Sequence, residues 1–352
     1  MIGADIFVIV VVLSLILANG LLKIKSDDGI KQAEYLYYQP KNTIDVAFLG
    51  SSHVHCDINS AVLWKDYGIA SYELSAADQP LWITYHYFKE LLKRQSPKLV
   101  VVDMYVPARI REEYRYRWMR DNLYGMRFSK NKLDMLRVSV EDEVFWDYFP
   151  SFFGYHSRYD ELGWADLKYL FETGDEHRAF KGYTPYFERR PQDLPDVLRM
   201  YDSSDYLDVY ADFFDADGGL SKKNEEYLLK IIDLARENQI ELLFIATPYV
   251  IEKDDLPAFE KIEKIASENG IEFINYNYKY TDFDLDYAND LNDFSHLNYD
   301  GSCKFTTYLG KDIKDRFEIP DRRGDQKYKS WDDNVAYIES LAVENPIQTV
   351  IE

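Results

Sequence analysis

Cysteine and histidine are scarce in this chain, and basic residues are outnumbered. It has two cysteines and six histidines in 352 residues. Cys56 and Cys303 cannot build a disulfide framework and lack the spacing of metal ligands, so we interpret them as free buried thiols. The 41 Lys and Arg residues against 62 Asp and Glu give a net charge of −21. Such a field repels nucleic-acid phosphates, and no basic stripe opposes it, which argues against a nucleic-acid role.

Long hydrophobic runs are also absent, with one exception near the N-terminus. Residues Ile6 to Leu22 are apolar except for Ser14, Asn19 and Gly20. Spanning a bilayer takes about 20 apolar residues, with about 17 as a lower limit, so the run is either a signal anchor or a long signal-peptide core. No small-x-small cleavage site follows it, which favours a retained transmembrane helix. Lysines follow the run and none precedes it, so the positive-inside rule alone favours a cytoplasmic globular part.

Aromatic residues, in contrast, are abundant. The chain has 30 Tyr and 20 Phe, and hydrophobic residues make up 46% of it. Rings of this kind pack in cores, and they also stack on the pyranose rings of sugars. The composition therefore supports a substantial core and leaves sugar binding open as a second use.

Short apolar runs alternate with amphipathic stretches, a pattern typical of an α/β protein with a parallel sheet. The expected buried strands are residues 44–49, 70–74, 99–104, 241–246 and 272–275. The expected helices are one from Asn59, then residues 82–93, 225–237, 256–269 and 299–317. We therefore predict a three-layer α/β/α sandwich of flavodoxin-like type, in which ligands bind beyond the carboxyl ends of the strands.

The chain divides into four parts on this pattern. Residues 1–25 form the anchor, 26–43 a linker, 44–319 the α/β domain and 320–352 a polar tail with one amphipathic piece. Within the domain, an aromatic-rich insert at about 107–217 is too long to be a bare loop. We predict that it forms a lid or subdomain, with helical segments at 114–120 and 164–171.

Two segments carry groups suited to nucleophilic catalysis. Ser52 follows the first expected strand and enters a helix, whereas Asp293 and His296 lie on a loop before the last helix. A serine hydroxyl is a poor nucleophile unless a nearby base removes its proton. Imidazole suits that task, and a carboxylate on its other ring nitrogen fixes the tautomer. The sequence thus predicts a triad of Ser52, His296 and Asp293.

A Gly-x-Ser after the first strand and a late Asp-x-x-His resemble the SGNH (GDSL-like) hydrolase superfamily over residues 44–103 and 241–317. Further fragments are similar to a branch that includes the D-alanine transfer protein of teichoic-acid modification and alginate O-acetylation proteins: His296-Leu297-Asn298 before Gly301, Tyr155-His156-Ser157-Arg158, and Tyr328 with Trp331. The resemblance implies a membrane-tethered, extracytoplasmic protein that acts beside a membrane-bound O-acyltransferase. It also implies catalysis without a metal or cofactor.

The chain departs from that family where the oxyanion hole is expected. The family adds a Gly from a second block and an Asn from a third, but this chain has Leu74 to Gln79 without Gly, and Val102-Asp103-Met104-Tyr105 without Asn. Losing one oxyanion donor costs about 2.7–4 kcal/mol of transition-state stabilisation. The remaining candidates for donors and site wall are the N–H of Ser52, the turn of Ala77, Asp78 and Gln79, and His53.

Four further residues are candidates for substrate contact: Asp103, His156, Arg158 and Asn298. For His156 and Arg158, contact with an acyl donor or a glycan anion is one interpretation. A structural ion pair is the other.

Simpler interpretations exist for each motif. Ser52 could serve only as a helix cap, a position that serine favours. His53, His55 and Cys56 invite a zinc site, but no distant second ligand pair completes it. Asp282, Asp284, Asp286 and Asp293 imitate a calcium loop, yet Tyr287 replaces the turn glycine and Asp293 the bidentate glutamate, so we expect a solvated acidic loop.

The sequence as a whole predicts acyl-ester hydrolysis or O-acyl transfer on a cell-envelope glycan or teichoic acid, through an acyl-Ser52 intermediate, at the outer face of the cell membrane. Two alternatives stay open. One is a catalytically degenerate accessory protein that recruits an acyl carrier for the membrane acyltransferase. The other is an esterase that faces the cytoplasm.

Overall fold

The central feature of the fold is a parallel sheet of five strands. The structure, a computed structural model, describes residues 2–23, 25–109, 118–149, 154–155, 157–169, 174–201 and 219–350. The strand order is β2-β1-β3-β5-β6, and every neighbouring pair is parallel. The strands are β1 (Val46–Gly50), β2 (Ser71–Ser75), β3 (Leu99–Asp103), β5 (Glu241–Ala246) and β6 (Glu272–Asn275). The predicted α/β class and parallel sheet are confirmed.

Every residue of β1, β2 and β3 is buried. Strands covered on both faces carry continuous apolar runs in place of an alternating pattern, which is why the runs were recognisable in the sequence. The two strands β5 and β6 fall on the residues that the sequence predicts.

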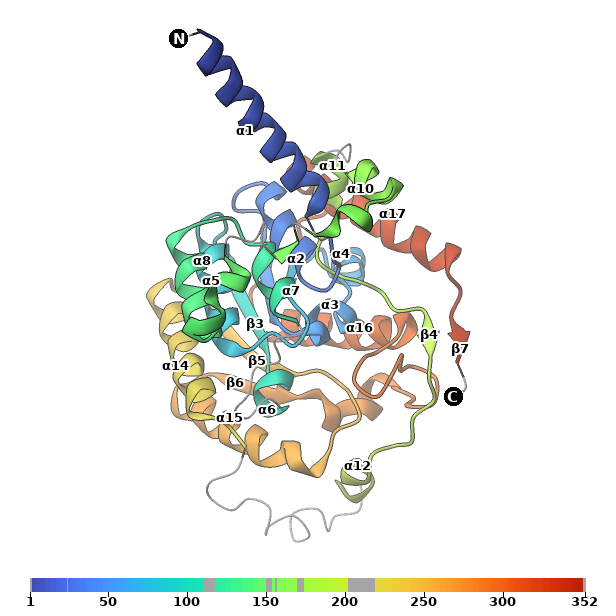
Figure 1. The fold of residues 1–352 in the computed structure, drawn as a ribbon. Coiled ribbons are helices and arrows are strands. Elements are labelled where there is room, and N and C mark those ends of the chain that lie inside the picture. Colours follow the sequence, from blue (N-terminus) through green and yellow to red (C-terminus); the bar gives the residue numbers. More distant parts are fainter. Residues whose placement is uncertain are drawn as a thin grey trace.

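One group of helices packs around α5 (Leu81–Leu92). It includes α8 (Lys130–Ser139) and α14 (Lys222–Glu237), both of which contact α5, and Figure 1 shows the three together beside the sheet. In this group α5 contacts β1 and α14 contacts β5. Next to them, α15 (Leu256–Glu268) packs on β6.

A second group packs around α4 (Ser60–Tyr67), which contacts β2. It contains α3 (Ser52–Asp57), α16 (Tyr299–Arg316) and α17 (Lys329–Glu344). As predicted, Asn59 begins α4, and its side chain accepts a hydrogen bond from the Ala61 N–H. The predicted polar tail contains α17, whose Trp331 is buried and donates its indole N–H to the Ser71 carbonyl over 3.0 Å. The tail is therefore packed on the sheet domain.

The insert between β3 and β5 contains several short elements. They are α6 (Tyr105–Arg109), α7 (Met119–Tyr124), η3 (Asp142–Val144), α9 (Phe145–Tyr148), η5 (Arg158–Asp160), α10 (Trp164–Tyr169), α11 (Gly174–Ala179), β4 (Glu188–Arg189) and α12 (Asp196–Tyr201). Strand β4 pairs with β7 (Gln348–Thr349) near the C-terminus. The predicted helix at 164–171 coincides with α10 where it is described. Most of the one at 114–120 lies outside the described residues.

The N-terminal helix α1 (Ile2–Leu22) projects away from the body of the molecule (Figure 1). Among the described residues, α1 is the one helix that is long and apolar enough to cross a membrane. The predicted linker after it is folded: α2 (Ile30–Tyr35) and η1 (Leu36–Tyr38) are packed on the domain. The other short helices are η7 (Lys253–Asp255), η8 (Tyr276–Phe283) and η9 (Gln326–Tyr328).

The strand order places a topological switch point at the end of β1. The chain goes from β1 to β2 on one side and then returns to β3 on the other side. Loops leaving β1 and β3 therefore diverge, and such a switch point is where open parallel sheets bind ligands. Ser51 and Ser52 follow β1 at this point, and Met104 and Tyr105 follow β3.

Candidate functional site

Three side chains from the two distant segments meet beyond the carboxyl ends of the strands. The Ser52 hydroxyl lies 2.8 Å from Nε2 of His296. On the other side of the ring, Nδ1 of His296 lies 3.0 Å from each carboxylate oxygen of Asp293. All three side chains remain partly accessible to solvent. Their contacts form the chain of hydroxyl, imidazole and carboxylate that nucleophilic catalysis requires.

The hydrogen-bond network assigns the tautomer of His296. An ionised carboxylate only accepts, so the proton of a neutral imidazole belongs on Nδ1, facing Asp293. Nε2 is then the acceptor that faces Ser52. Burial would raise the pKa of Asp293, but the hydrogen bond and charge of His296 and the Ser295 N–H lower it below its ordinary value. Asp293 is therefore a carboxylate throughout the neutral range.

A tight turn at the end of β1 presents Ser52. Gly50 has φ 149°, and a Cβ on it would lie 2.9 Å from the Cβ of Asp103, so only glycine fits there. Ser51 is the cap of α3: its hydroxyl oxygen accepts from the His53 N–H, and its O–H donates to Asp103 over 3.3 Å. Because Ser51 fills the capping role, the cap interpretation of Ser52 is wrong.

Behind the triad, a buried polar chain ties α3 to the loop of His296. His53 Nδ1 lies 2.7 Å from the Thr247 hydroxyl, which donates to Asp57 over 3.1 Å. Asp57 also accepts the Leu297 N–H over 2.9 Å. Burial lowers the pKa of His53 well below its ordinary value, and the charge of His296 acts in the same direction. His53 is thus a neutral wall residue, stacked on Tyr105 with 3.6 Å between ring centroids.

The Ser295 hydroxyl contacts both Asp293 and His296. The Ser295 O–H donates to Asp293 over 3.0 Å, and its oxygen lies 3.0 Å from His296 Nδ1. Tyr105 lies close to Ser295, and Arg109 donates to the Tyr105 hydroxyl over 3.3 Å. Ser295 lies within the Asp-x-x-His motif, so the motif could have revealed it, but only the fold brings Tyr105 and Arg109 to it.

The insert and the segment after α1 also reach the triad. The Tyr186 ring lies 5.6 Å from that of His296, and Tyr186 also lies close to Cys56. Asp28 lies near enough to His296 for the two charges to interact, and its carbonyl accepts the Ala77 N–H over 2.8 Å. No sequence motif marks Tyr186 or Asp28, because both come from segments without a recognisable pattern.

The predicted oxyanion turn is only partly suited to that role. The N–H of Ala77 is bonded to Asp28, and the N–H of Gln79 donates to the Ala76 carbonyl over 3.1 Å. Neither N–H can donate to a substrate without breaking its present bond. The prediction that Ala77 and Gln79 supply oxyanion donors is therefore wrong for this structure. Asp78 between them has φ 47°, and its charge acts on Tyr105. Ser52 is the first residue of α3, so its N–H has no intrahelical acceptor and remains a candidate donor.

Three of the four residues predicted to contact substrate are instead bonded to other parts of the protein. Asp103 is buried and accepts from Ser51 and from the Tyr105 N–H. Asn298 is buried and caps α16 by accepting from the Gly301 N–H. Arg158 donates to the carbonyl oxygens at the end of α1. The fourth residue, His156, lies outside the described residues.

The metal interpretations find no support. His55 bonds Ser75 over 2.9 Å while His53 bonds Thr247, so the two imidazoles have separate partners. Asp286 accepts hydrogen bonds from its own turn, including the Ala288 N–H. Within the described ranges, no group of three His, Cys, Asp or Glu side chains is placed to hold a metal ion.

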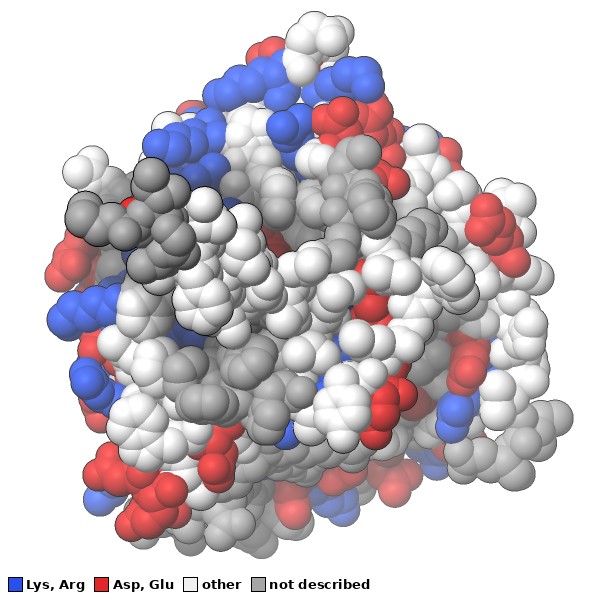
Figure 2. Space-filling model, turned by 45° about the horizontal axis from the view of Figure 1, so that its top comes forward, with Lys and Arg blue, Asp and Glu red and all other residues white. Residues whose placement is uncertain are grey.

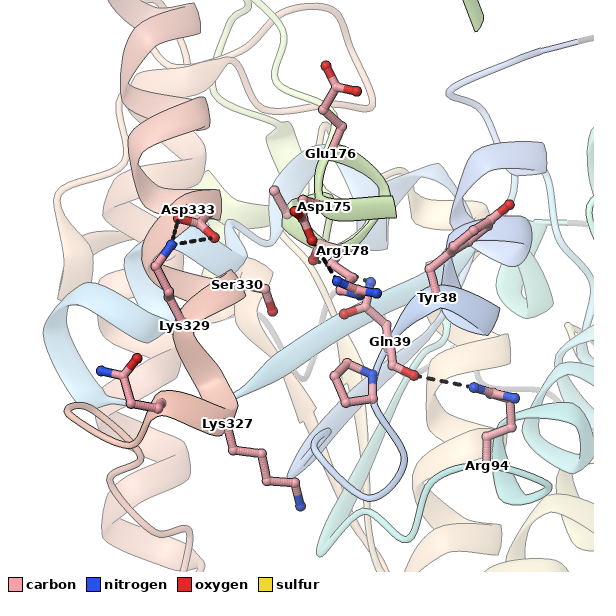
Figure 3. A pocket seen from close by; sticks show the side chains of 13 residues that line it. Tyr38, Gln39, Arg94, Asp175, Glu176, Arg178, Lys327, Lys329, Ser330 and Asp333 are labelled. Carbon is pink, nitrogen blue, oxygen red and sulfur yellow. Dashed lines mark hydrogen bonds and ion pairs between the residues drawn. The ribbon is translucent and has the colours of Figure 1, made fainter. Parts of the chain in front are cut away.

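A cavity of about 840 Å³ lies away from the triad (Figure 3). It is lined by segments that lead into β1 and β3, such as those of Gln39 and Arg94, whereas the triad lies where the strands end. Its charges are largely paired: Arg178 contacts Asp175 over 2.6 Å and Lys329 contacts Asp333 over 3.0 Å. The cavity therefore belongs to the opposite edge of the sheet.

Neither protein-family models nor curated protein sequences match this chain.

Proposed function

We propose that this protein is a serine-dependent acyl-ester hydrolase or O-acyltransferase of the SGNH type. The observation that carries the proposal is the 2.8 Å contact between Ser52 Oγ and His296 Nε2, with Asp293 on the other ring nitrogen. The two helix groups with the sheet between them support the finer assignment of a three-layer α/β/α sandwich. The strand order, which flavodoxin-like sheets share, supports it as well.

In the first half of the reaction, Ser52 attacks the carbonyl carbon of an acyl donor. His296 Nε2 takes the hydroxyl proton as the new C–O bond forms, and Asp293 stabilises the resulting imidazolium. The carbonyl oxygen becomes an oxyanion, which the Ser52 N–H stabilises. When the tetrahedral intermediate collapses, the bond to the leaving group breaks, and His296 returns the proton to that group. Ser52 then carries the acyl group as an ester.

The second half repeats these steps with a different nucleophile. A sugar hydroxyl or water gives its proton to His296 and attacks the acyl-Ser52 carbonyl. The Ser52 oxygen leaves and regains its proton from His296, so the enzyme is restored. Transfer and hydrolysis differ only in the acceptor, and no cofactor takes part in any step.

We place the reaction at the outer face of the cell membrane, on a cell-envelope glycan or teichoic acid, beside a membrane-bound O-acyltransferase. The lysines that follow α1 have structural partners: Lys23 pairs with Glu34 over 2.7 Å, and Lys25 donates to the Asp166 carbonyl over 3.2 Å. These contacts hold the segment after α1 on the domain. The positive-inside rule still favours the cytoplasm, and the resemblance to extracytoplasmic proteins is what supports the outer face. A reporter enzyme fused after Glu352 tests the placement, and cytoplasmic reporter activity would contradict it.

A fluorophosphonate probe tests the proposed nucleophile. The full chain is treated with the probe, and the adduct is located by peptide mass spectrometry. We expect one adduct on Ser52, none in Ser52→Ala, and an undiminished adduct in Ser51→Ala, the matched control at the neighbouring serine. An unlabelled wild-type protein that retains its thermal unfolding transition would overturn the proposal.

One observation favours a second candidate function. The N–H groups of Ala77 and Gln79 are already bonded, so oxyanion stabilisation rests largely on Ser52. The site would then be too weak for turnover, and the protein would recruit an acyl carrier for the membrane acyltransferase. Labelling of Ser52 together with absence of ester turnover would favour this alternative.

A further inference from the structure

Large hydrophobic side chains are exposed on several short elements of the insert. Phe128 is 70% exposed, Trp146 67%, Tyr159 73% and Trp164 87%. We call these four residues the aromatic face. Solvent-exposed side chains of this size, gathered on one side of a protein, mark an interaction surface.

Ring contacts join one part of this face. Phe128 stacks on Phe149, which also contacts Trp146, with centroid separations of 5.8 and 6.4 Å. Tyr124 lies near Tyr148 of α9 and near Tyr155, and the rings of Tyr124 and Tyr155 lie 5.8 Å apart. Figure 2, in which the top of the view of Figure 1 comes forward, shows uncharged side chains over much of the centre and charged side chains mostly toward the rim.

The aromatic face is attached directly to the end of α1. Arg158, next to Tyr159, donates from Nη1 to the Leu22 carbonyl over 2.9 Å and to the Lys23 carbonyl over 3.0 Å. These carbonyls end a helix and have no intrahelical partner, and a cation there is also favoured by the helix dipole. The same guanidinium lies 3.4 Å from Asp166 of α10, which contacts α1. Arg158 thus fixes the helix end to this face.

The length and surface of α1 identify what lies beside the face. A helix of 21 residues is about 31 Å long, close to the roughly 30 Å hydrocarbon core of a bilayer. Its large apolar side chains are exposed on all sides, including Phe7, Leu13 and Ile16. If α1 spans a bilayer, its last residues lie at the headgroups, and the attached aromatic face lies there too. Trp and Tyr are the side chains that concentrate in this layer.

We propose that the aromatic face rests in the headgroup layer of the lipid bilayer that α1 crosses, so that the globular domain lies against the membrane. The net charge of −21 gives no general attraction to anionic lipids, so attachment would depend on the aromatic rings and α1. The site is then close to the membrane. Asp28 follows Leu22 by a few residues, at most about 20 Å of extended chain, and its carbonyl bonds the Ala77 turn beside the triad.

Fluorescence quenching in lipid nanodiscs tests the proposal with the full chain. Lipids brominated on the acyl chains quench indoles that reach the bilayer, whereas iodide quenches indoles exposed to water. We expect bromolipids to quench part of the tryptophan emission, and Trp146→Phe and Trp164→Phe each to remove a share of that quenching. Trp331→Phe, at a buried position, should leave the bromolipid-sensitive share unchanged.

The opposite pattern would overturn the proposal. If the bromolipid-sensitive emission survives both substitutions, or iodide quenches Trp146 and Trp164 in nanodiscs, the face is open to water. A protein partner would then be its occupant. Because both side chains are exposed, replacement by phenylalanine should leave the fold intact, as thermal unfolding would verify. Ser52→Ala should show wild-type quenching, so this outcome does not depend on the proposed reaction.

Discussion

Ser51 and Ser52 are adjacent in the chain, but their side chains contact different groups: Ser51 bonds the protein interior and Ser52 bonds His296. Ser51 is buried, caps α3 and donates to Asp103, whereas Ser52 is partly exposed and contacts His296. The division follows from the extended backbone of Ser51, with φ −91° and ψ −162°, which directs its side chain back over the first turn of the helix. One serine therefore holds the turn, and the other is available for chemistry.

This division predicts opposite effects for two alanine substitutions. Ser51→Ala removes a cap and should lower the free energy of unfolding by about 1–2 kcal/mol while the protein keeps its esterase activity. Ser52→Ala should abolish turnover of a simple activated ester with little change in stability. Urea unfolding and ester hydrolysis, measured on both variants, check the pair. Residual turnover in Ser52→Ala above the buffer rate would contradict it.

Asp293→Asn should disable the base without unfolding the loop. The retained oxygen can still accept from the N–H groups of Ser295 and His296, now at 2.8 and 2.9 Å. The new amide N–H₂ would face His296 Nδ1 and stabilise the tautomer whose Nε2 carries the proton. We expect kcat to fall roughly 10³–10⁴-fold at neutral pH. A loss below about tenfold would show that Asp293 does not set the tautomer.

Ser295 is expected to act as a positioning residue. Ser295→Ala removes the O–H donated to Asp293 but keeps the backbone N–H that closes the loop. We predict a fall in kcat of about tenfold with KM nearly unchanged, because one charged hydrogen bond is worth about 1.5 kcal/mol. Ser295→Thr restores the hydroxyl and should recover most of the activity. If threonine gives no recovery, the effect of alanine is one of packing.

Asp103 should make stability fall as pH rises. Burial raises its pKa to about 7, against 3.8 for an exposed aspartate, so the folded protein holds an extra proton between these values. Its contribution to the free energy of unfolding is then lost as pH rises from about 4 to about 7. We expect the stability of the wild type relative to Asp103→Asn to fall by about 2–4 kcal/mol between pH 4 and pH 8.

Urea unfolding of both proteins across this range measures that difference. Asp134→Asn is the control: Lys130 lowers the pKa of Asp134, so the stability of the wild type relative to this variant should not fall as pH rises. A flat difference for Asp103→Asn would show that its carboxyl ionises over the same pH range in the folded protein as in the unfolded chain.

Gly50→Ala should destabilise the protein through the turn before the triad. Its Cβ would meet the Cβ of Asp103 at 2.9 Å and a Val54 methyl at 3.1 Å, at a φ of 149°. We expect a loss of about 2–3 kcal/mol in chemical denaturation. Gly270 has φ 70° but open space around it, so Gly270→Ala measures the cost of the backbone conformation alone. This variant should lose less stability than Gly50→Ala. Equal losses would show that the close approach of Asp103 is unimportant.

The sequence predicted the sheet well because its strands are buried on both faces and read as short apolar runs. The residues of β5 and β6 agree with the prediction, and Asn59 begins α4 as expected of a strong capping residue. The chemistry of the side chains and their order along the chain predicted the triad of Ser52, Asp293 and His296. Apart from α10, most of the short elements of the insert could not be assigned, since they carry too few residues for a helical period to emerge.

By itself, then, the sequence determined which segments are strands, which residues can exchange a proton, and that one apolar helix precedes them. Those properties depend on neighbours in the chain and on side-chain chemistry. Only the tertiary structure decided which distant groups meet: Ser52 with His296, Thr247 between His53 and Asp57, and Arg158 at the end of α1 and not at a substrate. Such contacts join residues far apart in the chain, so no local pattern encodes them.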